Sequence, residues 1–291
     1  MKLDFQDHRR QLHANRYVYA VVSRRAGGLS IGINLNPDKA CNFACPYCQV
    51  DRQGKDKSPP VDIERLHTEL EQLLQWVHDG VLWSIPPFDT AQEKHRRVAD
   101  ISFAGDGEPT SAKSFASAVK RVTQLKRGFG LAHIKIQLLT NATLFHRSNV
   151  QEGLHELWDN GGEVWAKLDA GTESWFQLID GTQFPFSKVL SNIQWAAQKG
   201  TLVLQCMFHR WEGEAPSPEE ITEWCARIAE IYHAGGSIRL IQVYSVARRP
   251  ADSRVSMLEE AVLMAIAEQA REVVEAYQQD TIVQHYPGLP V

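Results

Sequence analysis

The sequence predicts an α/β fold, a partial TIM-like (β/α)6 barrel, with a doubly wound parallel sheet as the alternative. Short runs rich in Val, Ile and Leu alternate along the chain with longer segments of helical period. The short runs are almost continuously apolar, which is typical of strands buried on both faces of a parallel sheet. Residues able to bind or react follow several of these runs, and active sites in such folds gather at the carboxyl ends of the strands.

Six strands and six helices are predicted in alternation. The strands cover Leu29–Leu35, Val98–Phe103, Ile134–Leu139, Val164–Leu168, Leu202–Phe208 and Ile238–Tyr244. The helices lie near Asp62–His78, Ala112–Lys126, Asn149–Trp158, Phe186–Gln198, Pro218–His233 and Met257–Gln278, and several begin at Ser or Asp and end at Gly. We therefore expect an N-terminal extension over 1–28, the barrel over 29–250, and a C-terminal helix and tail over 251–291 that pack on the barrel.

Composition narrows the class of protein. The 291 residues are 43% hydrophobic and 23% charged, and no window reaches the roughly 18 consecutive apolar residues of a membrane span. Met1–Arg10 lacks the apolar stretch of a secretory signal, so we expect a protein of the reducing cytoplasm with no membrane partner. The net charge of -4 gives no overall attraction to nucleic acid. The first segment is nevertheless locally basic, through Arg9, Arg10, Arg16, Arg24 and Arg25.

Three of the five cysteines lie close together, at Cys41, Cys45 and Cys48. The segment reads CNFACPYC and follows the first predicted strand, so the three thiols share one loop at a strand end. This clustering does not resemble a disulfide framework, whereas thiolates are soft ligands for iron–sulfur clusters and for zinc. A structural zinc site usually closes with four ligands, often two distant pairs of cysteines, and this sequence has no second pair. Three thiolates with a distant fourth ligand could still hold zinc. A zinc-stabilised binding module is therefore the alternative interpretation.

The cysteine loop resembles the signature of the radical S-adenosylmethionine (SAM) superfamily, including the aromatic Tyr47 directly before the last cysteine. The resemblance implies a radical SAM core in which Cys41, Cys45 and Cys48 ligate a [4Fe–4S] cluster and leave one iron open. In that family the open iron binds the amino and carboxylate groups of SAM. Reduction of the cluster cleaves SAM to a 5′-deoxyadenosyl radical, which abstracts hydrogen from the substrate.

A second motif, AGDGEPT, follows the second predicted strand. Glycines at this position let the backbone approach a ligand closely, although a Gly–Asp–Gly turn is also an ordinary loop. The motif resembles the glycine-rich segment that receives the methionine amino group of SAM in radical SAM enzymes. The resemblance therefore implies that five consecutive residues cradle the methionine part of SAM: Gly105, Asp106, Gly107, Glu108 and Pro109.

Polar side chains also follow the later strands. Short polar groups at strand ends can bind ribose hydroxyls or a carboxylate, so Asn141, Lys167 and Asp169 are candidates for contacts with SAM. Asn141 is alternatively a turn or helix-capping residue, and Lys167 with Asp169 is alternatively a plain ion pair. The radical SAM resemblance implies that Tyr47 and the segment Tyr244–Val246 flank the adenine of SAM.

Two cysteines lie outside the loop. Cys206, in the apolar run LVLQCMF, and Cys225, in a predicted helix, are interpreted as buried apolar residues. Cys206 is also a candidate hydrogen donor, if its strand turns the thiol toward the interior of the barrel.

Four segments indicate one branch of the superfamily. They read SIGINLNPDKACNFACPYCQ, GDGEPT, KLDAGTESWFQLIDG and IQVYSVARRP. Over Ser30–Pro250 they resemble the tRNA wyosine-synthesis enzymes and their bacterial relatives of unassigned role. The second N-terminal cysteine cluster and the flavodoxin-like domain that some of those enzymes carry are not found in this sequence. An electron donor such as flavodoxin or ferredoxin is implied. The substrate is a tRNA base, a peptide or protein side chain, a small metabolite, or a partner protein activated as a glycyl radical.

Three further features each have two interpretations. Gly80–Arg97 is a substrate lid or an electron-donor dock, or else a surface loop with a solvated charge run. Arg210 binds an anionic group or forms a surface ion pair. Arg248 and Arg249, beyond the sixth strand, contact a phosphate or carboxylate or lie on the surface.

Overall fold

The computed structural model describes residues 15–23, 27–50, 59–248, 250 and 252–288. The chain forms two compact units. The first comprises Met1–Ala40, Lys55–Leu139 and Arg147–Glu163, and the second comprises Cys41–Gly54, Thr140–His146 and Val164–Val291. The predicted domain boundaries at 28/29 and 250/251 stay predictions. Five of the arginines singled out from the sequence lie outside the described residues: Arg9, Arg10, Arg24, Arg25 and Arg249.

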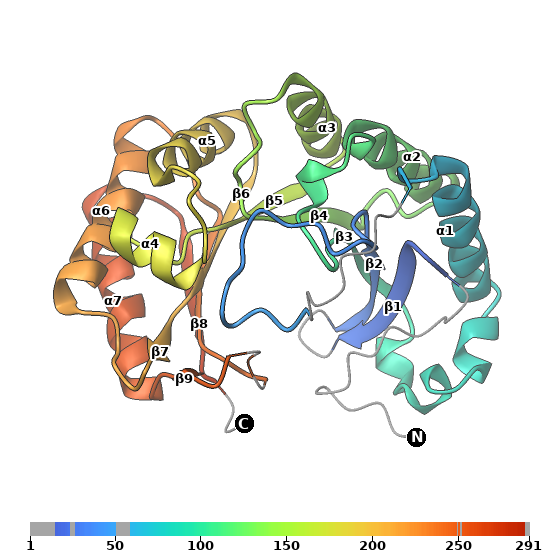
Figure 1. The fold of residues 1–291 in the computed structure, drawn as a ribbon. Helices are drawn as coiled ribbons and strands as arrows, with labels where there is room; N and C mark the ends of the chain where they lie inside the picture. The colour runs from blue at the N-terminus through green and yellow to red at the C-terminus, as the bar shows by residue number, and fades with distance from the viewer. Residues whose placement is uncertain (1–14, 24–26, 51–58, 249, 251, 289–291) are drawn as a thin grey trace. The chain divides into compact units, whose positions relative to one another are not determined.

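In the first unit, strands follow one another in the order β1, β2, β3 and β4 (Figure 1). The strand β1 (Val18–Ser23) runs antiparallel to β2 (Gly28–Ile33). The strands β3 (Val98–Phe103) and β4 (Lys135–Thr140) continue the sheet in parallel with β2. Most residues of β2 and β3 are buried, as their apolar sequences predict for strands covered on both faces.

Three helices accompany this sheet: α1 (Ile63–His78), α2 (Phe115–Gly128) and α3 (Ser148–Asp159). α1 packs on α2, and α2 packs on α3. The helix α1 begins at Asp62, whose side chain accepts a hydrogen bond from the N–H of Arg65. Its leucines at helical spacing, including Leu66, Leu70 and Leu73, are fully buried. The sequence pattern that predicted this helix is thus the pattern of its packed face.

A buried carboxylate joins α1 to the start of β1. Glu69 accepts hydrogen bonds from the backbone N–H groups of Arg16, Tyr17 and Val18, at 2.8, 2.8 and 3.1 Å. The guanidinium of Arg65, one helical turn earlier, pairs with the same carboxylate at 2.8 Å. Because these N–H groups precede or begin the strand, Glu69 satisfies donors that the sheet does not. This ties the N-terminal strand to the helix layer.

The long connection over 80–97 folds into three short 3-10 helices: Val81–Ser84, Phe88–Thr90 and Glu93–His95. Leu82 and Phe88 are buried, and the first of these helices packs against α1. The charged side chains of Lys94, Arg96 and Arg97 are exposed. The segment is therefore anchored to the first unit by apolar contacts and presents its charges outward, which favours the surface-loop interpretation.

In the second unit, four parallel strands follow in the order β5, β6, β8 and β10. They are β5 (Glu163–Lys167), β6 (Leu202–Met207), β8 (Leu240–Tyr244) and β10 (Ile282–Tyr286). The helices are α4 (Glu173–Ile179), α5 (Phe186–Lys199), α6 (Pro218–His233) and α7 (Glu260–Ala276), packed in sequence order on one another, and α7 also lies against β8 and β10 (Figure 1). A separate antiparallel pair joins β7 (His209–Trp211) to β9 (Val255–Met257).

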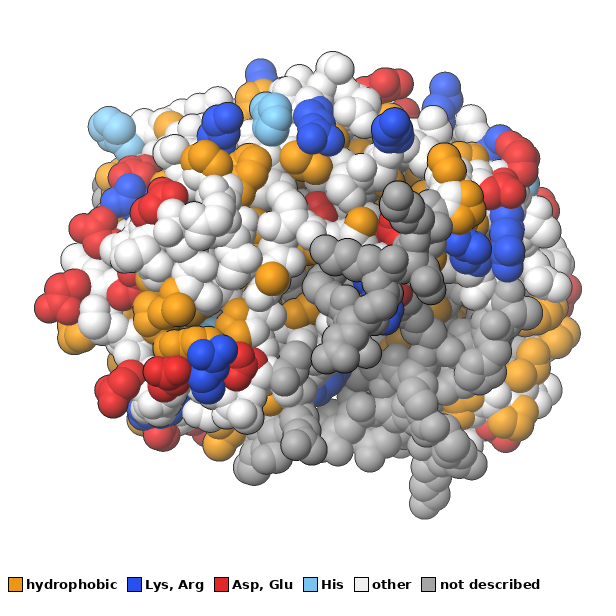
Figure 2. Space-filling model, in the orientation of Figure 1, with side chains coloured by type: hydrophobic (Ala, Val, Ile, Leu, Met, Phe, Trp, Pro, Cys, Tyr) orange, Lys and Arg blue, Asp and Glu red, His pale blue; other side chains and the backbone are white. Residues whose placement is uncertain are grey.

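The α/β class and the parallel arrangement of the six predicted strands within their units are confirmed, and the six predicted helices are present. Four strands were not predicted, namely β1, β7, β9 and β10, nor was the short helix α4. Among the described residues, no helix is both long and apolar enough to cross a membrane. Acidic and basic side chains are interspersed over the described surface of the face drawn in Figure 2, in line with the net charge of -4.

Candidate functional site

The cysteine loop is fixed against the turn that follows α4. The N–H of Ala44 donates to the carbonyl oxygen of Asp180 at 3.1 Å, and the hydroxyl of Thr182 donates to the carbonyl oxygen of Asn42 at 3.1 Å. Gly181, between Asp180 and Thr182, has a φ of 57°, and a Cβ on it would collide with the carbonyl of Ala44. Only glycine combines this backbone conformation with so close an approach. The loop thus lies on a turn shaped to receive it.

An aromatic side chain anchors the same loop. Phe43 is buried and packs edge-on against Phe176 of α4, with 5.5 Å between the ring centroids. Phe176 stacks in turn on Phe186 at the start of α5. The loop between the first two cysteines is therefore held by an apolar contact as well as by hydrogen bonds.

A second turn, Asn141–Thr143, follows β4 and contacts the first cysteine. The Nδ2 group of Asn141 donates to the side-chain oxygen of Asn42 at 2.8 Å and lies 3.9 Å from the sulfur of Cys41. The turn itself is held by Asn192 of α5, which donates to the carbonyl of Ala142 at 2.7 Å. Asn141 therefore helps to position the residues at Cys41.

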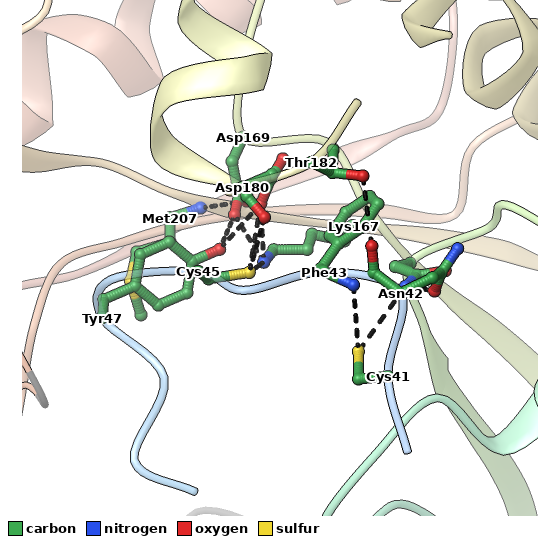
Figure 3. A network of polar contacts seen from close by, with 11 residues as sticks. Cys41, Asn42, Phe43, Cys45, Tyr47, Lys167, Asp169, Asp180, Thr182 and Met207 are labelled. Atoms are coloured by element: carbon green, nitrogen blue, oxygen red, sulfur yellow. Dashed lines mark hydrogen bonds and ion pairs between the residues drawn. The ribbon is translucent and has the colours of Figure 1, made fainter. Parts of the chain in front are cut away.

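The second cysteine meets a buried lysine. The ammonium of Lys167, at the end of β5, donates to the sulfur of Cys45 at 3.0 Å (Figure 3). The same ammonium pairs with Asp180 at 2.8 Å and with Asp169 at 3.3 Å. It also lies over the ring of Tyr47, 4.4 Å from the centroid. Figure 3 shows the side chains of Cys45, Tyr47, Lys167, Asp169 and Asp180 converging in one group.

Asp169 connects these side chains around Lys167 to β6. One carboxylate oxygen accepts a hydrogen bond from the N–H of Met207 at 2.8 Å, and the other accepts from the hydroxyl of Tyr47. The ring of Tyr47 packs edge-on against His209 of β7, at 5.3 Å between centroids. Tyr47 is thus held by Asp169 at its hydroxyl, by the edge-on ring of His209, and by the ammonium of Lys167 over its ring.

The burial of these groups shifts their acidity. Burial alone would lower the pKa of Lys167, but Asp180, Cys45 and Asp169 together raise it well above its usual value. Burial raises the pKa of Asp169 to about 6, against the lowering effect of Lys167. Burial likewise raises the pKa of Cys45 to about 12, and it raises the pKa of Tyr47 well above the usual value. Lys167 therefore carries a fixed positive charge among these buried side chains.

In the first unit, the AGDGEPT loop packs against the segment that leads into Cys41. The N–H of Glu108 donates to the carbonyl oxygen of Ala40 at 3.0 Å, and Asn34 donates to the carboxylate of Asp106 at 2.9 Å. A Cβ on Gly107 would collide with that same carbonyl of Ala40. The glycine is therefore required for close packing directly before the cysteine loop.

The remainder of this loop begins a short 3-10 helix, Pro109–Ser111. The side chain of Glu108 accepts hydrogen bonds from the N–H and hydroxyl of Thr110, at 3.1 and 2.6 Å. Glu108 is 2% exposed, so its carboxylate is buried in the turn and stabilises it.

Most of the predicted site residues lie in the second unit. Six of them meet in the network just described: Cys41, Cys45, Tyr47, Asn141, Lys167 and Asp169. Cys48 is tied to the same loop by its N–H, which donates to the carbonyl of Cys45 at 2.9 Å. Tyr244 ends β8 beside Met207, and Val246 is buried just beyond it. Gly105–Pro109 belong to the first unit.

Cys206 lies in the core of the second unit and is fully buried. Phe208, directly after β6 and two positions beyond Cys206, packs edge-on against Trp224 of α6 at 5.0 Å between ring centroids. Because alternate residues of a strand share a face, the thiol of Cys206 points to the helix layer. This placement favours a packing role over hydrogen donation.

Two arginines singled out from the sequence have protein partners. Arg210 pairs with Glu259 of the second unit at 2.6 Å, in line with a surface ion pair. Arg248 donates to the side-chain oxygen of Gln49 at 3.1 Å, one residue beyond the cysteine loop.

Sequence reasoning did not assign the residues that hold the loop. Asp180 and Thr182 supply its main contacts, and Asn42 connects it to the Asn141 turn. The only signal for the first two was the Asp–Gly–Thr turn after an amphipathic segment. Asp180 follows a helix rather than a strand, so the rule that active sites gather at strand ends does not reach it.

A family model described as the Radical SAM superfamily matches residues 35–210, which is more than half of the chain. The chain belongs to the radical SAM superfamily. Radical SAM proteins are iron–sulfur enzymes whose cofactors are a [4Fe–4S] cluster and SAM, and this chain is such an enzyme. The match decides against a zinc-stabilised binding module.

Curated relatives are similar over part of their length. They include a protein described as GTPase Obg from Brachyspira hyodysenteriae, 24% identical over 63% of this chain and 23% of that protein. A UPF0026 protein of Helicobacter pylori strain J99 is 26% identical over 60% of this chain and 49% of its own. A UPF0026 protein of Synechocystis is 28% identical over 65% and 63%. This radical SAM chain thus spans from about a quarter to less than two thirds of the length of these relatives.

Solved structures share the fold. SuiB of Streptococcus suis bound to SAM aligns with a TM-score of 0.61 at 14% identity, over 90% of this chain and 52% of that one. TYW1 with a lysine–pyruvate adduct aligns at 0.50 and 13%, over 88% and 74%. Spore photoproduct lyase aligns at 0.53 and 9%, over 84% and 74%. These alignments confirm the predicted partial TIM-like barrel of the radical SAM core.

The cysteine loop fits a cluster by its chemistry. Three thiols within one short, anchored loop offer the soft donors that iron–sulfur clusters take. Within the part of the chain that the structure describes, no three His, Cys, Asp or Glu side chains converge as ligands of a metal ion. The sulfur of Cys45 is directed instead at Lys167 and Asp180. To bind a cluster, the sulfur of Cys45 must therefore take iron as a further partner, or give up Lys167 or Asp180 for it.

Proposed function

We propose that this radical SAM enzyme holds its [4Fe–4S] cluster through Cys41, Cys45 and Cys48. The observation that carries the proposal is the anchoring of the three-cysteine loop to Asp180 and Thr182. Those contacts fix the backbone beside the first two thiols, so that the donors need only side-chain rotation to bind iron. When bound, the cluster and SAM supply a 5′-deoxyadenosyl radical that abstracts hydrogen from the substrate.

The other predicted residues receive SAM. Gly105–Pro109 present backbone groups to its methionine part, since the turn of Glu108 is already built. Asn141 follows β4 and offers its amide to ribose hydroxyls or to the carboxylate of SAM, whereas Asp169, beyond the end of β5, offers its carboxylate to ribose hydroxyls. Lys167 was predicted with them, but its ammonium is engaged within the protein by Cys45, Asp180 and Asp169. Tyr47 and Tyr244–Val246 flank adenine. The buried hydroxyl of Tyr47, held by Asp169, keeps this wall rigid.

Three classes of substrate remain open to test: a tRNA base, a peptide or protein side chain including a glycyl-radical partner, and a small metabolite. The net charge of -4 and the interspersed surface charges favour a substrate with few phosphates. The cluster requires an electron, so we assign flavodoxin or ferredoxin as its donor and the reducing cytoplasm as its compartment.

The decisive experiment is anaerobic reconstitution with iron and sulfide, followed by reduction with SAM present. We expect about four irons for each chain and the release of 5′-deoxyadenosine. Changing Cys41, Cys45 or Cys48 to Ala is expected to abolish both. Cys225→Ala, which removes a thiol from α6, is the matched control and is expected to leave both unchanged.

Two results would contradict the proposal. One is a protein that takes up one zinc and neither iron nor sulfide. The other is 5′-deoxyadenosine production that survives in all three loop variants. Adding bulk tRNA, peptides or small metabolites to the same assay then identifies the substrate class, as the addition that stimulates turnover.

A further inference from the structure

Lys167 has three close partners within the protein. Its ammonium lies 3.0 Å from the sulfur of Cys45, 2.8 Å from Asp180 and 3.3 Å from Asp169. A lysine ammonium has three N–H donors. Here it donates to the sulfur of Cys45 and forms ion pairs with both carboxylates. The side chain is 17% exposed, so water does not compete strongly for these bonds.

The position of the ammonium does not depend on how Cys45 turns. Asp169 is fixed by the N–H of Met207 and the hydroxyl of Tyr47. The backbone of Asp180 is held by the N–H of Ala44, and its carboxylate accepts from the hydroxyl of Tyr47 at 3.3 Å. These two carboxylates keep Lys167 in place when the sulfur bonds to iron.

The backbone of Cys45 is also fixed. The N–H of Ala44 is bound to Asp180, and the carbonyl of Cys45 accepts from the N–H of Cys48. Rotation about the side chain moves the sulfur only around its own Cβ. The backbone contacts of Cys45 and the carboxylates around Lys167 thus keep the sulfur and the ammonium close together.

We propose that Lys167 is a positioning residue of the cluster, which donates a hydrogen bond to the sulfur of Cys45 and raises the reduction potential of the [4Fe–4S] centre. The inference rests on the proposed function, because it requires Cys45 to be a cluster ligand. A hydrogen bond and a positive charge at a ligand sulfur stabilise the reduced cluster, which carries the extra electron. The role differs from a contact with the SAM carboxylate, because the ammonium is already engaged by Cys45, Asp180 and Asp169.

The test compares reduction potentials of reconstituted proteins without SAM. The reduced cluster is followed by its electron paramagnetic resonance signal during a redox titration. Lys167→Met is expected to shift the potential to more negative values, because it removes the donor and leaves Asp169 and Asp180 behind. Lys167→Arg keeps the charge and N–H donors, so its potential is expected between those of Lys167→Met and the wild type.

A matched control separates this effect from loss of charge alone. Lys188→Met removes one lysine from an exposed position on α5 in the same unit. Its potential is expected to equal that of the wild type. Lys167→Gln serves as a second neutral variant in case Lys167→Met does not fold, and a potential below the wild type is expected for it too.

The affinity for SAM gives an independent readout. If Lys167 acts on the cluster, SAM binding to the oxidised Lys167→Met protein stays within about twofold of the wild type. A large loss of SAM affinity with an unchanged potential would assign Lys167 to SAM and overturn the inference. An unchanged potential with unchanged affinity would overturn it as well. A wild-type protein that forms no [4Fe–4S] cluster would instead reject the proposed function.

Discussion

At the scale of single residues, the site depends on a turn with no reactive group of its own. Gly181 lies between Asp180 and Thr182, the two residues that bind the cysteine loop. Its left-handed backbone and its contact with the carbonyl of Ala44 both exclude a Cβ. The shape of this turn therefore determines how close the loop can come to the residues that hold it.

Gly181→Ala is expected to lower both stability and cluster content. An alanine with positive φ costs about 1–2 kcal/mol, and its methyl group also displaces Ala44 beside Cys45. Gly235→Ala is the matched control, because Gly235 has a φ of 77° and nothing within 4 Å of its Cβ position. Urea unfolding should show a loss in both variants, whereas iron bound per chain should fall only in Gly181→Ala. Equal iron content in the two variants would show that the close contact has no role in shaping the loop.

The residues of the site differ in how far the sequence predicted them. Asn141, Lys167 and Asp169 were found because polar side chains at parallel strand ends lie close in space. Tyr47 was found through the family resemblance. Asp180 was missed, although it contacts both Lys167 and Cys45. Its pairing joins positions far apart in the sequence, and no local period encodes such a contact.

At the scale of elements, the same difference separates predicted from unpredicted strands. The central strands β2, β3, β6 and β8 are buried and nearly all apolar, so composition alone indicates them. The strand β10 has only half-buried or exposed residues and lies at one end of its sheet. Edge strands need fewer apolar side chains, and so their sequences resemble loops. The three-residue strands β7 and β9 are too short to show a period.

The helix α6 holds the loop that carries Asp169. It begins at Ser217, and Glu220 stands at the position that often reaches back to the start of its own helix. Here the carboxylate of Glu220 instead accepts hydrogen bonds from the N–H of Gly171 at 2.5 Å and from the hydroxyl of Thr172 at 2.6 Å. These residues lie two and three positions after Asp169, so the helix fixes the segment that follows β5.

Glu220→Ala is expected to destabilise the protein by about 2–3 kcal/mol, because it leaves the N–H of Gly171 and the hydroxyl of Thr172 without their charged acceptor. Glu219→Ala, at the exposed neighbouring position, is the control and is expected to change stability by less than about 0.5 kcal/mol. Urea unfolding of the cluster-free proteins measures both. A loss in Glu220→Ala no larger than in Glu219→Ala would show that this carboxylate does not hold the loop.

At the scale of the whole molecule, the residues proposed to hold the cluster and SAM occur in both compact units. The cysteines, Lys167 and Asp169 belong to the second unit, and the AGDGEPT loop belongs to the first. Ligands that bind only the folded protein stabilise it by mass action. A SAM molecule bound to the loaded cluster should therefore stabilise the folded enzyme.

Thermal unfolding should therefore respond to SAM only in the cluster-loaded enzyme. At a SAM concentration about 100 times Kd, binding adds about 2.7 kcal/mol to the stability of the folded state, and Tm rises accordingly. The control is a variant with Cys41, Cys45 and Cys48 all changed to Ala, which lacks the iron that binds the amino and carboxylate groups of SAM. Its Tm is expected to stay unchanged at the same SAM concentration, measured by anaerobic circular dichroism. An equal rise in Tm for both proteins would mean that SAM binds without the cluster, which would contradict the assignment of the three cysteines.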